Sequence, residues 1–188
     1  MENKFQFDPA THTYLSGERI LPSVTEIVTS VCGEPSYASE WHMNRGRAVH
    51  KAIALTIKGT LDESTIDDRI RPYLDTAKKA LSELKISQFV IIETPMLHKV
   101  LQYAGTLDLF TDEGILIDFK TNQHSPTTQI QLGGYSELLK SNGYKVNGCW
   151  ELVIGETNYK LTKYKPEKCI RLFLAAYTLY GWQKEEKR

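Results

Sequence analysis

Two aspartates and a lysine, close together in the sequence, are the strongest candidates for chemistry. Asp108 is followed ten residues later by Asp118, and Lys120 comes two residues after that. The segment 112–114 (Asp-Glu-Gly) lies between two apolar runs and predicts the three-residue turn of a β-hairpin. A turn at this place would put Asp108 directly across from Asp118 on neighbouring strands.

Two carboxylates facing each other destabilise a sheet unless a cation lies between them, and hard oxygen ligands suit Mg²⁺ or Mn²⁺. Side chains alternate along a strand, so Leu116, Asp118 and Lys120 should share one face, with residues 115, 117 and 119 on the other. Three charged side chains on one face of an apolar hairpin would make an unusual core. We therefore interpret Asp108, Asp118 and Lys120 as a metal-dependent site for phosphodiester chemistry.

Three further patterns accompany the hairpin. Glu93 lies in a preceding predicted strand, QFVIIETPM. Gln131 and Tyr135 are four residues apart and share one face of a following helix. Gly46 and His50 have the same spacing on an earlier helix with an apolar face.

In this order, the patterns resemble the PD-(D/E)XK nuclease superfamily, in particular its RecB-like and phage lambda exonuclease-like branches. The resemblance implies a Mg²⁺- or Mn²⁺-dependent deoxyribonuclease with one or two ions. It implies that the catalytic residues are Glu93, Asp108, Asp118 and Lys120. The implied metal ligands are His50, Glu93, Asp108, Asp118 and the main-chain carbonyl of Phe119, and the implied substrate-binding residues are Gln131 and Tyr135.

Structural alternatives remain open for several of these residues. His50 could be a core histidine, because it shares an apolar stripe with Ile53 and Ala54. Gln131 and Tyr135 could form an internal hydrogen-bond network rather than contact DNA. Glu93 could be a carboxylate at a strand end that faces solvent.

Length and composition agree with one enzyme domain over residues 1–188, with N-terminal elements in 1–85 and the catalytic core in 86–188. The polar N-terminus and the lack of a membrane-length apolar segment predict a cytoplasmic protein without membrane contact. The three cysteines are Cys32, Cys149 and Cys169. Their wide spacing argues against the iron-sulfur cluster of some RecB-like enzymes.

Charge is unevenly distributed although the formal net charge is zero. Residues 61–119 contain 11 acidic and 6 basic residues, net −5, whereas residues 140–188 contain 5 acidic and 10 basic residues, net +5. The basic third could follow a DNA backbone while the acidic centre holds metal, or it could be an ordinary solvated face.

The expected fold is α/β, with a mixed sheet flanked by helices. We predict N-terminal strands at 5–8, 12–16 and 19–21, and then helices at 23–30, 37–58 and 66–85. The core is expected as strands 88–94, 100–110 and 115–121, a helix from Ser125-Pro126 to Gly143, strands 146–154 and 158–164, and a helix from Pro166 to about Tyr180. This is a restriction-endonuclease-like α-β-β-β-α-β core with an N-terminal hairpin and helical extension.

The resulting functional hypothesis is an exonuclease acting on single- or double-stranded DNA ends in recombination or end processing. Three alternatives are a structure-selective DNA endonuclease, a nuclease-fold protein that binds DNA without cleaving it, and a hydrolase of small phosphoesters. The last lacks support because the sequence has no Gly-rich phosphate loop. A homo-oligomer and a recombination partner protein are left open.

Overall fold

The computed structural model describes residues 4–33, 40–86 and 88–186. Its strands are β1 (Phe5–Asp8), β2 (Thr13–Ser16), β3 (Arg19–Leu21), β4 (Phe89–Leu97), β5 (Ala104–Thr111), β6 (Ile115–Thr121), β7 (Gly148–Ile154) and β8 (Tyr159–Tyr164). Its helices are α1 (Val24–Cys32), α2 (Glu40–Ile57), the short 3-10 helix η1 (Glu63–Thr65), α3 (Arg71–Glu83), α4 (Thr128–Ser141) and α5 (Pro166–Glu186).

A five-stranded mixed sheet in the order β4-β5-β6-β7-β8 positions the candidate site. Strands β6 and β7 pair in parallel, and the other neighbours in this sheet pair antiparallel. A parallel pair needs a crossover connection, which α4 supplies. The order from α3 to β7 is α-β-β-β-α-β, so the expected fold class is confirmed. Strands β1, β2 and β3 form a separate antiparallel sheet.

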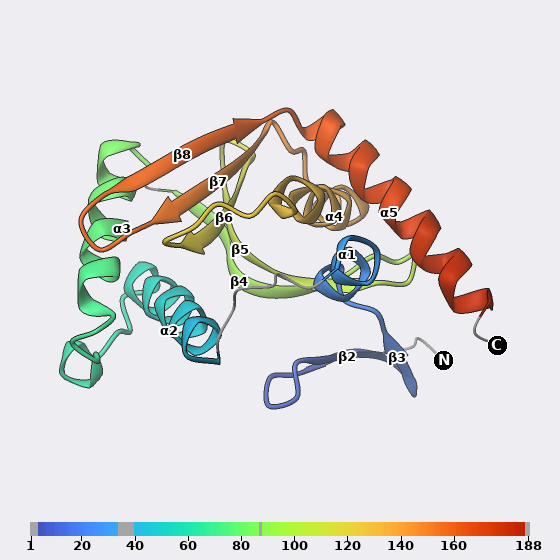
Figure 1. Cartoon of the computed structure of the whole chain (residues 1–188), viewed down its shortest axis with the longest axis horizontal. Helices are drawn as coiled ribbons and strands as arrows, with labels where there is room; N and C mark the ends of the chain where they lie inside the picture. Colours follow the sequence, from blue (N-terminus) through green and yellow to red (C-terminus); the bar gives the residue numbers. More distant parts are fainter. Residues whose placement is uncertain (1–3, 34–39, 87, 187–188) are drawn as a thin grey trace.

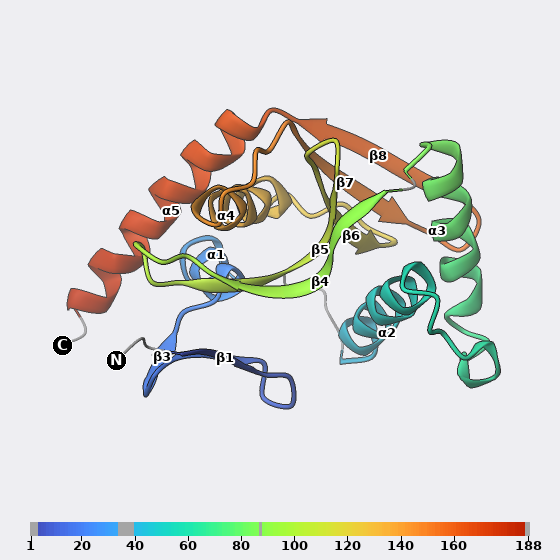
Figure 2. The same cartoon turned by 180° about the vertical axis from the view of Figure 1, so that it is seen from behind.

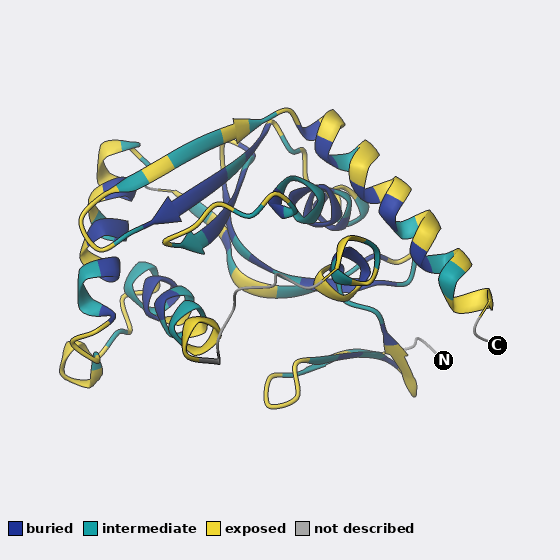
Figure 3. Ribbon diagram, in the orientation of Figure 1, coloured by how far each residue is buried: buried dark blue, intermediate teal, exposed yellow. Residues whose placement is uncertain are grey.

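Helices cover both faces of the five-stranded sheet (Figures 1 and 2). α1, α4 and α5 lie on one face, and α2 and α3 lie on the other. Strand β7 is buried along most of its length, whereas the edge strand β8 is partly exposed (Figure 3). Leu116 of β6 joins the core next to α4, while Ile117 and Phe119 join the core next to α2 and α3. This alternation confirms the predicted faces of β6.

Several element boundaries differ from the expectation. α3 begins at Arg71 rather than near residue 66, with Pro72 in its first turn. α4 begins at Thr128, and the hydroxyl of the proposed cap Ser125 bonds to Thr127 Oγ1 rather than to a backbone N–H of the first turn. β5 begins at Ala104, after a turn in which Gln102 has a φ of 54°. α5 continues to Glu186, six residues past the predicted end. Residues 37–39 of the predicted second helix lie outside the described ranges.

Close packing of α4 against α5 depends on glycine. A Cβ atom on Gly133 would lie 2.1 Å from the carbonyl oxygen of Cys169, far inside contact distance. We expect Gly133→Ala to lower the melting temperature strongly, since the two helices must move apart in a packed core. Gly181→Ala on α5 is the matched control: a Cβ atom there meets nothing within 4 Å, so it should stabilise the helix by up to about 1 kcal/mol. Thermal unfolding of both variants tests this prediction. Equal changes in melting temperature for Gly133→Ala and Gly181→Ala would contradict the close packing of α4 against α5.

Within the described residues, no helix is long and apolar enough to cross a membrane.

Candidate active site

The two aspartates lie where β5 and β6 separate. The strands pair as far as Leu109↔Ile117, which is the register predicted from the turn. Asp108 and Asp118 come next in this register but are not ladder partners. Instead, the N–H of Phe119 donates to Asp108 Oδ2 at 2.8 Å. The expectation that the carboxylates face each other directly is therefore wrong, because the ladder ends one residue before them.

Asp108 is held by His50, which α2 brings to the hairpin. His50 Nδ1 lies 3.1 Å from Asp108 Oδ1, although 58 residues separate them in sequence. Burial lowers the pKa of His50, but the charge and hydrogen bond of Asp108 outweigh it, so the pKa is raised. Burial raises the pKa of Asp108, but His50 outweighs it and the pKa is lowered. The imidazole is 25% exposed and thus borders the site rather than being enclosed in the core.

Asp118 has a different cationic partner. Its Oδ2 lies 2.5 Å from Lys120 Nζ, and its side chain is 3% exposed. Burial and the nearby charge of Asp108 raise the pKa of Asp118 to about 6, despite the opposing effect of Lys120. Burial lowers the pKa of Lys120, but Asp118 outweighs it and raises that pKa. The negative charge of each aspartate is therefore balanced by a different side chain, that of His50 for Asp108 and that of Lys120 for Asp118.

Helix α4 joins the site through a relay of hydrogen bonds. Lys120 Nζ donates to Gln131 Oε1 at 3.0 Å, and Gln131 Nε2 donates to the hydroxyl of Tyr135 at 2.9 Å. Burial, with the charges of Asp118 and Asp108, raises the pKa of Tyr135. Gln131 and Tyr135 therefore form the internal hydrogen-bond network that was the structural alternative for them, and this network ends at Lys120. Contact of these residues with DNA stays a prediction.

Glu93 interrupts β4 beside Asp108. The pairs Ile92↔Leu109 and Thr94↔Leu107 flank the two acidic residues, so Glu93 lies level with Asp108. Glu93 has a φ of 42°, a left-handed conformation that is strained for a residue with a Cβ. It is exposed and lines a hollow that it shares with His50 and Asp108. Backbone strain of this kind is concentrated at functional sites.

The donor atoms at this place are of the kind that a divalent cation binds. Asp118 Oδ2 is buried and has no hydrogen-bond partner among the described residues, its ion pair with Lys120 aside. Carboxylate oxygens suit both Mg²⁺ and Mn²⁺, and an imidazole nitrogen favours the transition metal Mn²⁺ over Mg²⁺. The described part of the chain contains no group of three His, Cys, Asp or Glu side chains already arranged to hold an ion. Binding would require Asp108 and Asp118 to exchange their present partners for the ion.

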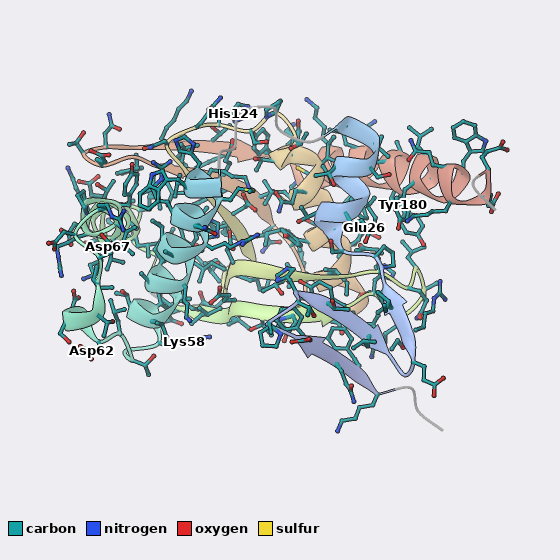
Figure 4. The ribbon with its side chains drawn as sticks, turned by 60° about the horizontal axis from the view of Figure 1, so that its bottom comes forward. Glu26, Lys58, Asp62, Asp67, His124 and Tyr180 are labelled. Atoms are coloured by element: carbon teal, nitrogen blue, oxygen red, sulfur yellow. The ribbon has the colours of Figure 1, made fainter. Side chains whose placement is uncertain are left out.

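Glu151 is a buried carboxylate that the sequence interpretation missed. It lies beside Asp118 in the parallel pair of β6 and β7 and is 0% exposed. His124 Nδ1 lies 2.6 Å from its Oε2, and the hydroxyl of Tyr164 and the N–H of Ser125 also donate to it. Glu151 thereby fixes the loop between β6 and α4, on which Figure 4 labels His124. The sequence feature that could have identified Glu151 is its position as a single acidic residue inside the apolar run CWELVI.

Comparisons with known proteins identify the fold. No family model and no curated protein sequence matches the chain. The structure is similar to that of a proposed exonuclease from Eubacterium rectale, with a TM-score of 0.55 and 9% identity over 84% of this chain and 77% of that one. It is also similar to an alkaline exonuclease from Laribacter hongkongensis, with a TM-score of 0.50 and 12% identity over 89% of both chains.

The Laribacter hongkongensis enzyme is also known in complex with dAMP, and that structure matches with a TM-score of 0.50 and 11% identity over 89% of each chain. The chain therefore has the fold of these exonucleases. The similarity is one of fold, and it agrees with the resemblance to exonucleases found in the sequence.

Proposed function

We propose that the protein is a Mg²⁺- or Mn²⁺-dependent nuclease that hydrolyses DNA phosphodiester bonds, and that it acts as an exonuclease in recombination or end processing. The observation that carries the proposal is the pair of aspartates where β5 and β6 separate, each with its own cationic partner. The shared fold with two exonucleases supports it. The deoxynucleotide bound to one of them favours DNA as the substrate.

Each residue of the site then has a definite task. His50, Glu93, Asp108, Asp118 and the carbonyl of Phe119 would hold the ion. A bound ion of this kind lowers the pKa of a water molecule and neutralises charge on the phosphoryl oxygens.

Lys120 would orient the attacking water and donate to a phosphoryl oxygen as negative charge grows there. Gln131 and Tyr135 keep the ammonium of Lys120 in place, and they would position the DNA backbone when substrate enters. Two tyrosines of β8, in the basic third, are hydrogen-bonded to glutamates of the protein. Tyr159 donates its hydroxyl to Glu83, and Tyr164 donates to Glu151.

Digestion of four DNA substrates tests the proposal. Linear and closed-circular DNA, each single- and double-stranded, are incubated with the protein and Mn²⁺, Mg²⁺ or a chelator. An exonuclease releases nucleotides from linear DNA alone and only with a divalent ion. Cleavage of closed circles would favour the structure-selective endonuclease instead. Binding without cleavage of any substrate would favour the non-cleaving alternative and contradict the proposal.

A thermal-shift experiment tests whether His50 is a ligand. We expect Mn²⁺ to raise the melting temperature of the wild type, and His50→Ala to reduce that rise, since the imidazole then no longer contributes to binding. Ile53→Val, one turn further along α2 and buried, is the matched control. It should lower the melting temperature equally with and without Mn²⁺. An unchanged Mn²⁺ effect in His50→Ala would assign His50 to packing.

A further inference from the structure

The outward face of α5 carries an apolar stripe that no described residue covers. The inner face packs on α1 and α4 through buried side chains such as Phe173 and Tyr180. Tyr180 donates its hydroxyl to Glu26 of α1, and Figure 4 labels both residues. α5 runs along the edge of the molecule, and its outward side is exposed over its whole length (Figures 1 and 3). The stripe, which we call the α5 seam, consists of Lys168, Leu172, Ala175, Leu179, Trp182 and Glu186.

The spacing of the α5 seam is that of a helix that pairs with another helix. Its members are separated by four, three, four, three and four residues, which is the alternation of the contact positions in a coiled coil. Leu172 is 38% exposed, Leu179 49% and Trp182 59%, so three large apolar side chains face water in one row. Such a row on the surface marks an interaction site.

The charges at the two ends of the α5 seam indicate its partner. Lys168 lies at one end and Glu186 at the other, and neither forms an ion pair with a residue that the structure describes. When two copies of α5 pack antiparallel about a two-fold axis, Lys168 of each copy meets Glu186 of the other. Leu172 then meets Trp182, and the small Ala175 meets Leu179. A parallel arrangement would instead bring lysine to lysine and glutamate to glutamate.

We propose that the α5 seam binds a second copy of this chain in an antiparallel, two-fold symmetric dimer. The small central residue lets the helices approach closely, and the ion pairs close both ends of the apolar row. The contact area of one helix face is small, so the dimer is weak and reversible. The proposal goes beyond the nuclease activity and does not depend on it.

Sedimentation over a concentration range tests the dimer. The wild type is measured from about 1 μM to about 1 mM, a range that covers weak association. We expect the mass to rise from one copy to two, and Leu179→Lys to raise the dissociation constant at least about tenfold, which corresponds to about 1.4 kcal/mol. Leu174→Lys is the matched control, because Leu174 is 36% exposed on the same helix but lies outside the seam.

A charge exchange tests the antiparallel arrangement. Lys168→Glu and Glu186→Lys should each weaken the dimer, because each creates a pair of like charges across the axis. The double variant should restore it, since the ion pair is then re-formed with its members exchanged. A wild type that stays monomeric up to the highest concentration would overturn the proposal. So would a dimer that Leu179→Lys leaves unchanged, or single charge variants that the double variant fails to rescue. Circular dichroism confirms that each variant is folded.

Discussion

Lys120→Ala should reduce the rate of DNA cleavage at least about 10²-fold, because the variant loses the ammonium that faces the reacting phosphate. The structure adds a second expectation. Asp118 is buried and would lose its cationic partner, so the metal-free variant should be less stable, on the order of 3 kcal/mol. Mn²⁺ should recover part of this stability, because the ion takes the place of the ammonium beside Asp118.

A second substitution keeps the test valid if the alanine variant folds poorly. Lys120→Gln retains a donor for Asp118 but no positive charge, and it should be equally inactive while more stable. Lys79→Ala removes an exposed lysine of α3 that pairs with Glu83, outside both the site and the basic third, and should cleave DNA at the wild-type rate. Cleavage by folded Lys120→Gln at nearly the rate of the wild type would remove Lys120 from the mechanism.

Asp108→Asn and Asp118→Asn should both weaken Mn²⁺ binding and abolish cleavage, yet change the metal-free stability in opposite directions. The pKa of Asp108 is lowered in the fold, so its ionised form stabilises the protein above its usual pKa of 3.8. Replacing it costs about 1 to 3 kcal/mol at pH 8, because His50 and the N–H of Phe119 lose a charged acceptor.

For Asp118 the effect of ionisation on stability has the opposite sign. Its pKa is raised from 3.8 to about 6, so the folded state holds the proton more tightly than the unfolded chain does. Its ionised form therefore reduces stability as the pH rises from about 4 through about 6. Asp118→Asn should raise the melting temperature at pH 8 in the presence of a chelator, and this gain should vanish below pH 4.

Calorimetry with Mn²⁺ and thermal unfolding at several pH values check the two aspartate variants together. Unchanged Mn²⁺ binding in both variants would exclude the proposed metal site. Shifts of melting temperature in the same direction would contradict the separate pairing of the two carboxylates.

The sequence predicted the hairpin well because its signals are local. The turn at residues 112–114 sets the register, and the strands follow it as far as Leu109↔Ile117, one residue before the two aspartates. Alternation along β6 then correctly places Ile117 and Phe119 on one face and Lys120 on the other. Both inferences need only neighbouring residues and strand geometry.

The partner of each carboxylate could not be predicted in the same way. The ladder between β5 and β6 ends at Leu109 and Ile117, while β5 stays paired with β4 and β6 with β7 beyond that point, and the turn does not predict this early separation. Glu151 enters the site region through the pairing of β6 with β7, and it also binds the N–H of Ser125 in the loop before α4. These contacts join residues from distant parts of the sequence, so the local pattern does not predict them.

The release of nucleotides from linear DNA with Mn²⁺ is the most direct test of the nuclease assignment. The wild type is compared with the Asp108→Asn, Asp118→Asn double variant, purified in parallel, and both are also assayed with a chelator. Our account predicts nucleotide release by the wild type with Mn²⁺, and none by the double variant or with the chelator. Equal release by the double variant, or no release by the folded wild type on any DNA, would contradict it.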